Sequence, residues 1–256
     1  MVPTIIAECS TNHGGERRHM ATMIHDAASA GADFAKFQSY SVKHLSPADP
    51  QYDWMRRCEL SNDDHKFIQD ECEKHKIGFM TTVFSPDRVK FLASLKLKAI
   101  KIGSGEAMNN KLLRAVSKHE WSAFVSTGLL TEGELSDIYV ELSVPYVLMH
   151  TVSKYPTATE EAALTRMAWL REIDCRVGYS DHTIGMTAAM TACAMGAEAI
   201  EVHMQGPARM TLWDKSTREV AHLAAFARES AVMRHWDSTV SLPEPRPYVG
   251  RWNYRG

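Results

Sequence analysis

The chain has no long apolar run, no excess of either charge and no paired cysteines. No segment approaches the ~20 apolar residues that span a bilayer, and the first residues lack the basic and apolar regions of a signal peptide. A formal net charge of −2 gives no basic field for nucleic acid. The five cysteines are scattered without a CxxC pair, which predicts a reducing, cytoplasmic setting. We therefore expect neither a membrane nor a nucleic-acid partner.

The chain instead has a regular alternation of short apolar runs and segments with helical periodicity. Eight strand–helix pairs in one domain predict an α/β fold, the (β/α)8 TIM barrel, and the length of 256 residues suits that fold. We expect the barrel to span residues 1–236 and residues 237–256 to form an extended tail rich in proline and aromatics. Strands are expected at 4–8, 34–38, 78–82, 99–102, 123–126, 146–150, 176–178 and 199–203; helices are expected at 17–30, 62–75, 86–95, 110–118, 132–142, 160–171, 186–195 and 217–235.

An open, doubly wound sheet is the alternative architecture. It would require a glycine-rich phosphate loop after an early strand. The segment Asn12-His13-Gly14-Gly15 follows the first predicted strand but is not GxGxxG. This mismatch favours the barrel. Residues 39–59 form a long irregular connection, which we interpret as a substrate lid.

Polar side chains follow many of the predicted strands. In a barrel, the C-terminal strand ends usually carry chemistry rather than packing. Two of them carry histidines, His182 and His203, and two neutral imidazoles converging on one spot suit a divalent transition metal. A hydrogen-bonded core histidine is the alternative for either residue alone. Other strand ends carry Glu8, Lys36, Gln38, Lys101, Ser104, Glu106 and Ser126.

Several short sequence blocks recur at or near the predicted strand ends: Ile6–Glu8, Asn12–Gly15, Lys36–Gln38, Phe79–Ser85, Lys101–Glu106, Ser126–Gly128, His150, Tyr155–Thr157 and Gly178–Thr183. Taken in order, these blocks resemble the N-acetylneuraminate (sialic acid) synthase family. The resemblance covers roughly residues 4–230 and implies a TIM barrel that condenses phosphoenolpyruvate with an open-chain, N-acetylmannosamine-like amino sugar. It implies a sialic-acid-type 2-keto sugar acid and phosphate as products, and a divalent metal, most often Mn²⁺ with Mg²⁺ or Co²⁺ as alternatives.

The resemblance implies a phosphoenolpyruvate site made of one cation and several hydroxyls, which is the donor set that a phosphate requires. The family has an asparagine where this chain has Ser153, so that contact departs from the pattern. Strand-end capping is the alternative role for each hydroxyl, and a surface position is the alternative for the lysine. The implied residues are Lys101, Ser104, Thr82, Ser126, Ser153, Ser180 and Gln38.

The resemblance also implies the catalytic and acceptor groups. His182 and His203 would hold the metal, which leaves positions open for water and substrate and polarises the aldehyde. Glu106 resembles the family carboxylate that accepts a proton from metal-bound water. Carboxylates also suit polyol recognition, because they accept from several hydroxyls. Further expected catalytic residues are Glu8, Lys36 and Asp214, and the expected acceptor-binding residues are Glu8, Tyr155, Tyr179 and Asp214.

Two of these assignments have structural alternatives. Lys36 could serve only as an ion-pair partner of Glu8 across adjacent strands. Tyr155 and Tyr179 could serve only in core packing.

The chain also departs from the family pattern. The family has a C-terminal antifreeze-like domain whose arginine reaches the partner subunit's site, and the sequence here stops at Gly256. We expect the tail or a separate antifreeze-like domain protein to substitute, and a homodimer through barrel helices. Trp213 adds an aromatic wall near the expected sugar site. Two alternatives follow: a related phosphoenolpyruvate-dependent keto-acid synthase with a different aldehyde acceptor, or a degenerate, non-catalytic barrel that acts as a binding partner.

Overall fold

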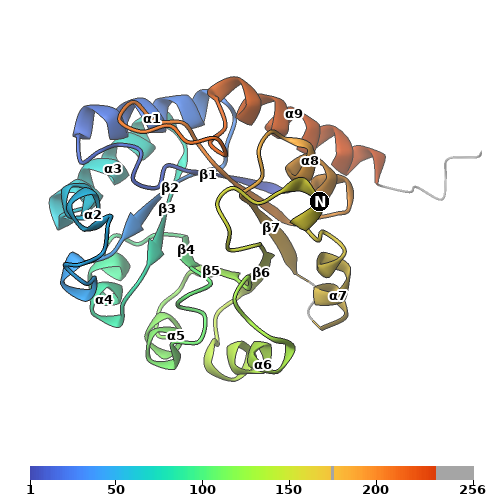
Figure 1. Cartoon of the computed structure of the whole chain (residues 1–256), viewed down its shortest axis with the longest axis horizontal. Helices are drawn as coiled ribbons and strands as arrows, with labels where there is room; N and C mark the ends of the chain where they lie inside the picture. The colour runs from blue at the N-terminus through green and yellow to red at the C-terminus, as the bar shows by residue number, and fades with distance from the viewer. Residues whose placement is uncertain (174–175, 235–256) are drawn as a thin grey trace, which may run out of the picture.

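The computed structural model describes residues 1–173 and 176–234. Eight parallel strands follow one another in chain order around a closed barrel (Figure 1). This closure confirms the predicted (β/α)8 barrel and excludes the open sheet. The strands are β1 (Thr4–Glu8), β2 (Phe34–Ser39), β3 (Gly78–Val83), β4 (Ala99–Ile102), β5 (Ser122–Ser126), β6 (Tyr146–His150), β7 (Val177–Asp181) and β8 (Ala199–His203).

Helices surround the barrel on its outside (Figure 1). None of those in the described part of the chain has the length and apolar character that crossing a membrane requires. They are α1 (Arg17–Ser29), α2 (Tyr52–Cys58), α3 (Asn62–His75), α4 (Pro86–Ser94), α5 (Asn110–Val116), α6 (Glu132–Glu141), α7 (Arg166–Ile173), α8 (Thr187–Ala194) and α9 (Thr217–Met233). Two 3₁₀ turns, η1 (Val42–His44) and η2 (Thr159–Glu161), lie in loops.

Strand register brings the polar strand ends together. Glu8 of β1 pairs with Lys36 of β2 on one side and with His203 of β8 on the other. On the next strands, Thr82 of β3 pairs with Lys101 of β4. Because all strands are parallel, these residues lie at the same end of the barrel. The opposite part of the interior is apolar and contains Ile6, Met80, Ala99, Phe124, Val147, Met149 and Ala199.

The start of α3 illustrates how local sequence fixes an element. Ser61 accepts a hydrogen bond from the Asp64 backbone amide, and the Asp64 carboxylate accepts one from the Ser61 amide. This capping box confirms the predicted start. At the other end of the helix, Lys76 adopts the left-handed conformation (φ 58°). The chain therefore leaves the helix at Lys76, two residues before β3 begins at Gly78.

The element predictions that differ from the structure by more than two residues concern one loop, one helix and one strand. The 39–59 connection is not wholly irregular, because it contains η1 and α2. Helix α7 begins at Arg166, well after the expected start, since η2 and a turn occupy the earlier residues. Strand β7 continues to Asp181 rather than ending at Gly178. The predicted tail, residues 237–256, lies outside the described residues.

Candidate active site

A cavity of about 390 Å³ opens at the C-terminal end of the barrel strands. It gathers all of the sequence-predicted site residues except Asp214 and Tyr179. The predicted residues that line it are Glu8, Lys36, Gln38, Thr82, Lys101, Ser104, Glu106, Ser126, Ser153, Tyr155, Ser180, His182 and His203.

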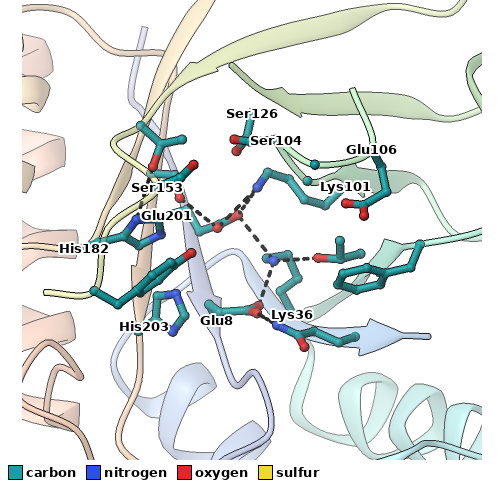
Figure 2. A pocket seen from close by; sticks show the side chains of 18 of the residues that line it. Glu8, Lys36, Lys101, Ser104, Glu106, Ser126, Ser153, His182, Glu201 and His203 are labelled. Atoms are coloured by element: carbon teal, nitrogen blue, oxygen red, sulfur yellow. Dashed lines mark hydrogen bonds and ion pairs between the residues drawn. The ribbon is translucent and has the colours of Figure 1, made fainter. Parts of the chain in front are cut away.

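Two lysines and two carboxylates occupy the centre of this cavity (Figure 2). Lys36 Nζ lies 2.8 Å from Glu8 Oε2 and 3.5 Å from Glu201 Oε2. Lys101 Nζ lies 3.3 Å from the same Glu201 oxygen. All four side chains are almost fully buried. The ion pair expected between Lys36 and Glu8 is therefore present, and it belongs to a larger network in which Glu201 joins both lysines.

Burial and the neighbouring charges act against each other in this network. Burial opposes ionisation of Glu201, yet Lys101 and Lys36 hold the pKa of its carboxyl below the usual range. Burial raises the pKa of Glu8, and Lys36 offsets only part of that effect. Burial lowers the pKa of Lys101, whereas Glu201 and Glu8 overcome burial at Lys36 and raise its pKa. The site therefore keeps Glu201 and Lys36 charged in its least solvated part.

Hydroxyl groups surround the two lysines. Lys36 Nζ donates to Thr82 Oγ1 at 2.8 Å, and Ser180 Oγ donates to Glu201 Oε1 at 2.9 Å. Ser104 Oγ accepts from the Gly128 amide at 3.1 Å. Figure 2 shows Ser104 and Ser126 beyond the Lys101 ammonium, opposite Glu8. Lysines together with hydroxyl donors form a suitable pocket for a phosphate group.

The two histidines face the cavity side by side, with their ring centroids 5.4 Å apart. His182 Nδ1 lies 2.7 Å from the Val152 carbonyl oxygen. That oxygen can only accept, so Nδ1 carries the proton and the Nε2 lone pair remains available. Burial lowers the pKa of both imidazoles to about 3. Both rings are consequently neutral near pH 7, the form in which imidazole binds metals.

The donor set fits a metal held by few protein ligands. Within residues 1–173 and 176–234, no group of three or more His, Cys, Asp or Glu side chains lies close enough to hold an ion. His182 and His203 would supply two nitrogen ligands, and water and substrate oxygens would supply the rest. Asp214 Oδ1, which is buried and lacks a hydrogen-bond partner, lies 4.0 Å from His203 Nδ1. At this separation the carboxylate makes no hydrogen bond to the His203 ring, so Asp214 is a neighbour of that ring and does not fix its orientation.

Glu106 faces the cavity from the Lys101 side, across the charged centre from the histidines (Figure 2). Its carboxylate packs against the backbone at Gly103, where an added Cβ would meet Glu106 Oε2 at 2.7 Å. Burial raises the pKa of Glu106 more than Lys101 lowers it. A carboxyl whose pKa is raised toward neutrality is suited to exchanging protons with substrate.

A second cavity of about 340 Å³ adjoins the first and shares Gln38, Met55, Tyr155 and His203 with it. It contains Asp214, whose Oδ2 accepts from the Thr211 amide at 2.6 Å and from Asn12 Nδ2 at 3.1 Å. The remaining lining residues are Ser10, Thr11, Asn12, Gln51, Arg209, Thr211 and Trp213. A two-part cavity of this kind can hold two reactants side by side.

Comparison with known proteins assigns the family. A model of the NeuB family matches residues 23–229 of the chain. The chain belongs to the NeuB family.

The relatives of this chain that carry a functional name are synthases. As a member of the NeuB family, the chain is therefore an enzyme of the synthase type. The N,N'-diacetyllegionaminic acid synthase of Legionella pneumophila is 31% identical over 250 residues, covering 88% of this chain and 68% of that protein. The pseudaminic acid synthase of Campylobacter jejuni is 32% identical over 219 residues, covering 78% of this chain and 64% of that protein. The chain thus spans about two thirds of the length of these relatives.

A solved structure supports the same assignment. The N-acetylneuraminic acid (sialic acid) synthetase of Leptospira borgpetersenii, in complex with citrate, aligns with a TM-score of 0.86 and 26% identity. The alignment covers 94% of this chain and 88% of that chain. The fold of this chain is therefore similar to that of a sialic acid synthetase.

Tyr179 does not lie where a substrate-binding residue of this NeuB-family site would lie. It is buried in the layer between strands and helices, lines neither cavity, and donates to Asp181 Oδ1 at 3.1 Å. The reason is alternation along β7. Because Ser180 and His182 face the barrel interior, Tyr179 and Asp181 face outward. The structure therefore places Tyr179 outside both cavities, in the packing role that was the alternative to substrate contact.

Glu201 is the central residue that the sequence prediction missed. It lies two positions before His203 on β8, and residues i and i+2 of a strand face the same side. Once His203 is predicted to face the barrel interior, Glu201 is therefore predicted to face it as well. Tyr155 does lie in the site, with its ring centroid 3.9 Å from that of His182.

Proposed function

We propose that this NeuB-family chain condenses phosphoenolpyruvate with the open-chain aldehyde of an N-acetylmannosamine-like amino sugar. The products are a sialic-acid-type 2-keto sugar acid and phosphate. One observation carries the proposal: a lysine-and-hydroxyl pocket and a pair of neutral histidines face into the same cavity. The lysine-and-hydroxyl pocket suits a phosphate, and the histidine pair suits a metal. The reaction needs the phosphate site and the metal site close together, because the two substrates must react with each other.

Phosphoenolpyruvate binds, in this proposal, through Lys101 and Lys36 and the surrounding hydroxyls. Glu201 holds both ammonium groups in place before substrate arrives. Thr82, Ser180 and Gln38 then direct the phosphate and carboxylate oxygens. Ser153 is a shorter donor at the rim of the same pocket. The barrel walls fix these donors in advance, so that little reorganisation accompanies binding.

The acceptor occupies the neighbouring cavity, with its aldehyde toward the histidines. Asp214 and Glu8 accept from sugar hydroxyls, and Tyr155 covers one face of the acceptor. A divalent cation held by His182 and His203, Mn²⁺ in this proposal with Mg²⁺ or Co²⁺ as alternatives, would polarise the aldehyde as a Lewis acid. The shared lining of the two cavities supports contact between the aldehyde carbon and the phosphoenolpyruvate methylene.

Water is the only further reactant. The methylene carbon of phosphoenolpyruvate forms a bond to the aldehyde carbon. Water adds to the carbon that bears the phosphate, and one of its protons passes through Glu106 to the former aldehyde oxygen. The C–O bond to phosphate then breaks, and the hydroxyl proton of the tetrahedral intermediate leaves with the phosphate, so that the keto group forms. The raised pKa of Glu106 suits this carboxyl to hold and return that proton.

A different acceptor is the second candidate, because the aromatic side chain of Trp213 lines the acceptor cavity. Its indole lies 5.7 Å from Tyr155, centroid to centroid, so two aromatic rings meet there. A non-catalytic role is disfavoured by the two lysines and two carboxylates at the centre of the cavity. Burying these charges is costly, and a barrel that no longer bound substrate would have no use for them. The cytoplasmic setting, the homodimer and a separate antifreeze-like partner protein stay predictions.

The test is phosphate release from phosphoenolpyruvate, measured with Mn²⁺ across a panel of N-acylated amino sugars. Release that depends on one acceptor and stops with a chelator is the expected result. No release with any acceptor, in protein that binds Mn²⁺, would point to an aldehyde outside the panel or to a missing partner protein. Absence of Mn²⁺ binding would favour the non-catalytic role.

A further inference from the structure

A buried ion pair lies behind the two histidines. Asp181 ends β7, and Lys215 precedes α9, with 3.5 Å between Lys215 Nζ and Asp181 Oδ2. Their side chains are 0% and 1% exposed, and neither residue lines either cavity. Burying two charges is costly, and an apolar pair of the same volume is often no less stable. The charges therefore call for an explanation beyond stability.

Asp181 fixes the turn that carries His182. Its Oδ1 accepts from the Thr183 amide at 2.9 Å and from Thr183 Oγ1 at 2.8 Å. Tyr179 donates to the same oxygen. Because these contacts come from both sides of His182, they restrain the backbone that sets the direction of its ring.

Lys215 connects that turn to the strand that carries His203. Its ammonium donates to the Thr183 carbonyl at 2.5 Å, and its backbone amide donates to the His203 carbonyl at 2.7 Å. The Gln205 amide in turn donates to the Lys215 carbonyl at 2.9 Å. Lys215 thus binds the end of β8 at His203 and Gln205 through its backbone, and it reaches the His182 loop through its side chain.

We propose that Asp181 and Lys215 act as a clamp that sets the position of His182 relative to His203. They are positioning residues, because they reach neither cavity. The link to metal binding rests on the proposed function, whereas the link between the two loops does not. Apolar residues could fill the same volume, but they could not hold both the amide and the carbonyl of Thr183.

The test compares three variants of the whole chain. Lys215→Met removes the ammonium and keeps the length of the side chain. Thr183→Val keeps both charges but removes one hydrogen bond to Asp181, and it carries the test alone if Lys215→Met does not fold. Glu198→Gln is the control, because it breaks the 3.0 Å ion pair with Arg176 at the opposite end of the barrel.

The first readout is hydrogen exchange of the metal-free protein, which needs neither metal nor substrate. We expect faster exchange in Lys215→Met at both 182–185 and 203–206, and in Thr183→Val at 182–185. The control should leave both segments unchanged. The second readout is the affinity for Mn²⁺, measured by electron paramagnetic resonance of the free ion. We expect a loss of about 10- to 100-fold in Lys215→Met, the range seen when residues that orient metal ligands are removed.

The outcomes separate this proposal from the one on function. Unchanged exchange at both segments in a folded variant would overturn the clamp. Faster exchange with unchanged Mn²⁺ affinity would also overturn the clamp, because the positions of the two histidines would then not depend on Asp181 and Lys215. If the wild-type chain binds no Mn²⁺ while exchange in the variants rises, the clamp stands and the metal assignment fails.

Discussion

Glu201→Gln gives the most direct test of the buried charge network, because it removes one charge and keeps the shape of the side chain. Glu201 lies 3.3 Å from Lys101 and 3.5 Å from Lys36. At an effective dielectric constant of ~20, each pair amounts to roughly 5 kcal/mol of Coulomb attraction before desolvation. Removing one partner of a buried pair costs about 3–5 kcal/mol in practice. The glutamine oxygen can still accept from Ser180, so we expect the lower end of that range.

The assay is urea denaturation at pH 7, comparing free energies of unfolding at an unchanged m value. Glu161→Gln is the matched control. Its ion pair with Lys154 is shorter, at 2.7 Å, but both side chains are largely exposed, so water screens the attraction. We expect only a small change there.

A second arm of this experiment adds inorganic phosphate. In Glu201→Gln the two lysines lack their shared counter-ion, so an anion that binds them should stabilise the variant more than the wild type. The reasoning is refuted if Glu201→Gln loses no more stability than Glu161→Gln. It is also refuted if phosphate stabilises both proteins equally.

Three further predictions concern the site and the core. His182→Ala should abolish Mn²⁺-dependent phosphate release and leave the circular dichroism spectrum intact; unchanged release would contradict the metal assignment. Gly103→Ala should lower turnover at least tenfold, because the new Cβ displaces the Glu106 carboxylate, whereas Gly105→Ala, with nothing within 4 Å, should not. Burial lowers the pKa of His65 to about 4, so only the unfolded chain takes up its proton as the pH falls below about 6.5. This histidine should therefore cost the wild type about 2 kcal/mol of stability between pH 7 and pH 5, and a His65→Leu chain whose urea midpoint falls as steeply would refute this.

The sequence predicts the barrel well because its strands are buried on both faces. Such strands appear as short apolar runs that end at a polar residue, and β1, β4, β6 and β8 have the predicted bounds. Polar residues within a strand defeat this criterion, as the Tyr179–Asp181 end of β7 shows. Side chains alternate between the two faces of a strand, and this alternation depends on position rather than on polarity. Applied to β7 and β8, it would have placed Tyr179 outside the barrel interior and Glu201 inside it.

Other features depend on tertiary structure and could not be read from the sequence. Helix α2 forms within a proline-containing loop, where the Tyr40 hydroxyl donates to the Met55 carbonyl at 2.8 Å. The assignment of Asp214 to a separate but adjoining cavity follows from its bonds to Asn12 and Thr211, which no local pattern reveals. The convergence of the polar residues on one cavity was thus predictable from the strand ends, and the presence of a second, adjoining cavity was not.

The pairing of β1 with β8 has a consequence for how this protein is made. Glu8 and His203 are neighbours in the register of that pair, although almost the whole barrel separates them along the chain. During synthesis, the first strand leaves the ribosome long before its last neighbour exists. The residues proposed to bind substrate and metal meet only when the final strand closes the ring. A nascent or truncated chain therefore has no partly working site, and ligand binding reports directly on completed folding.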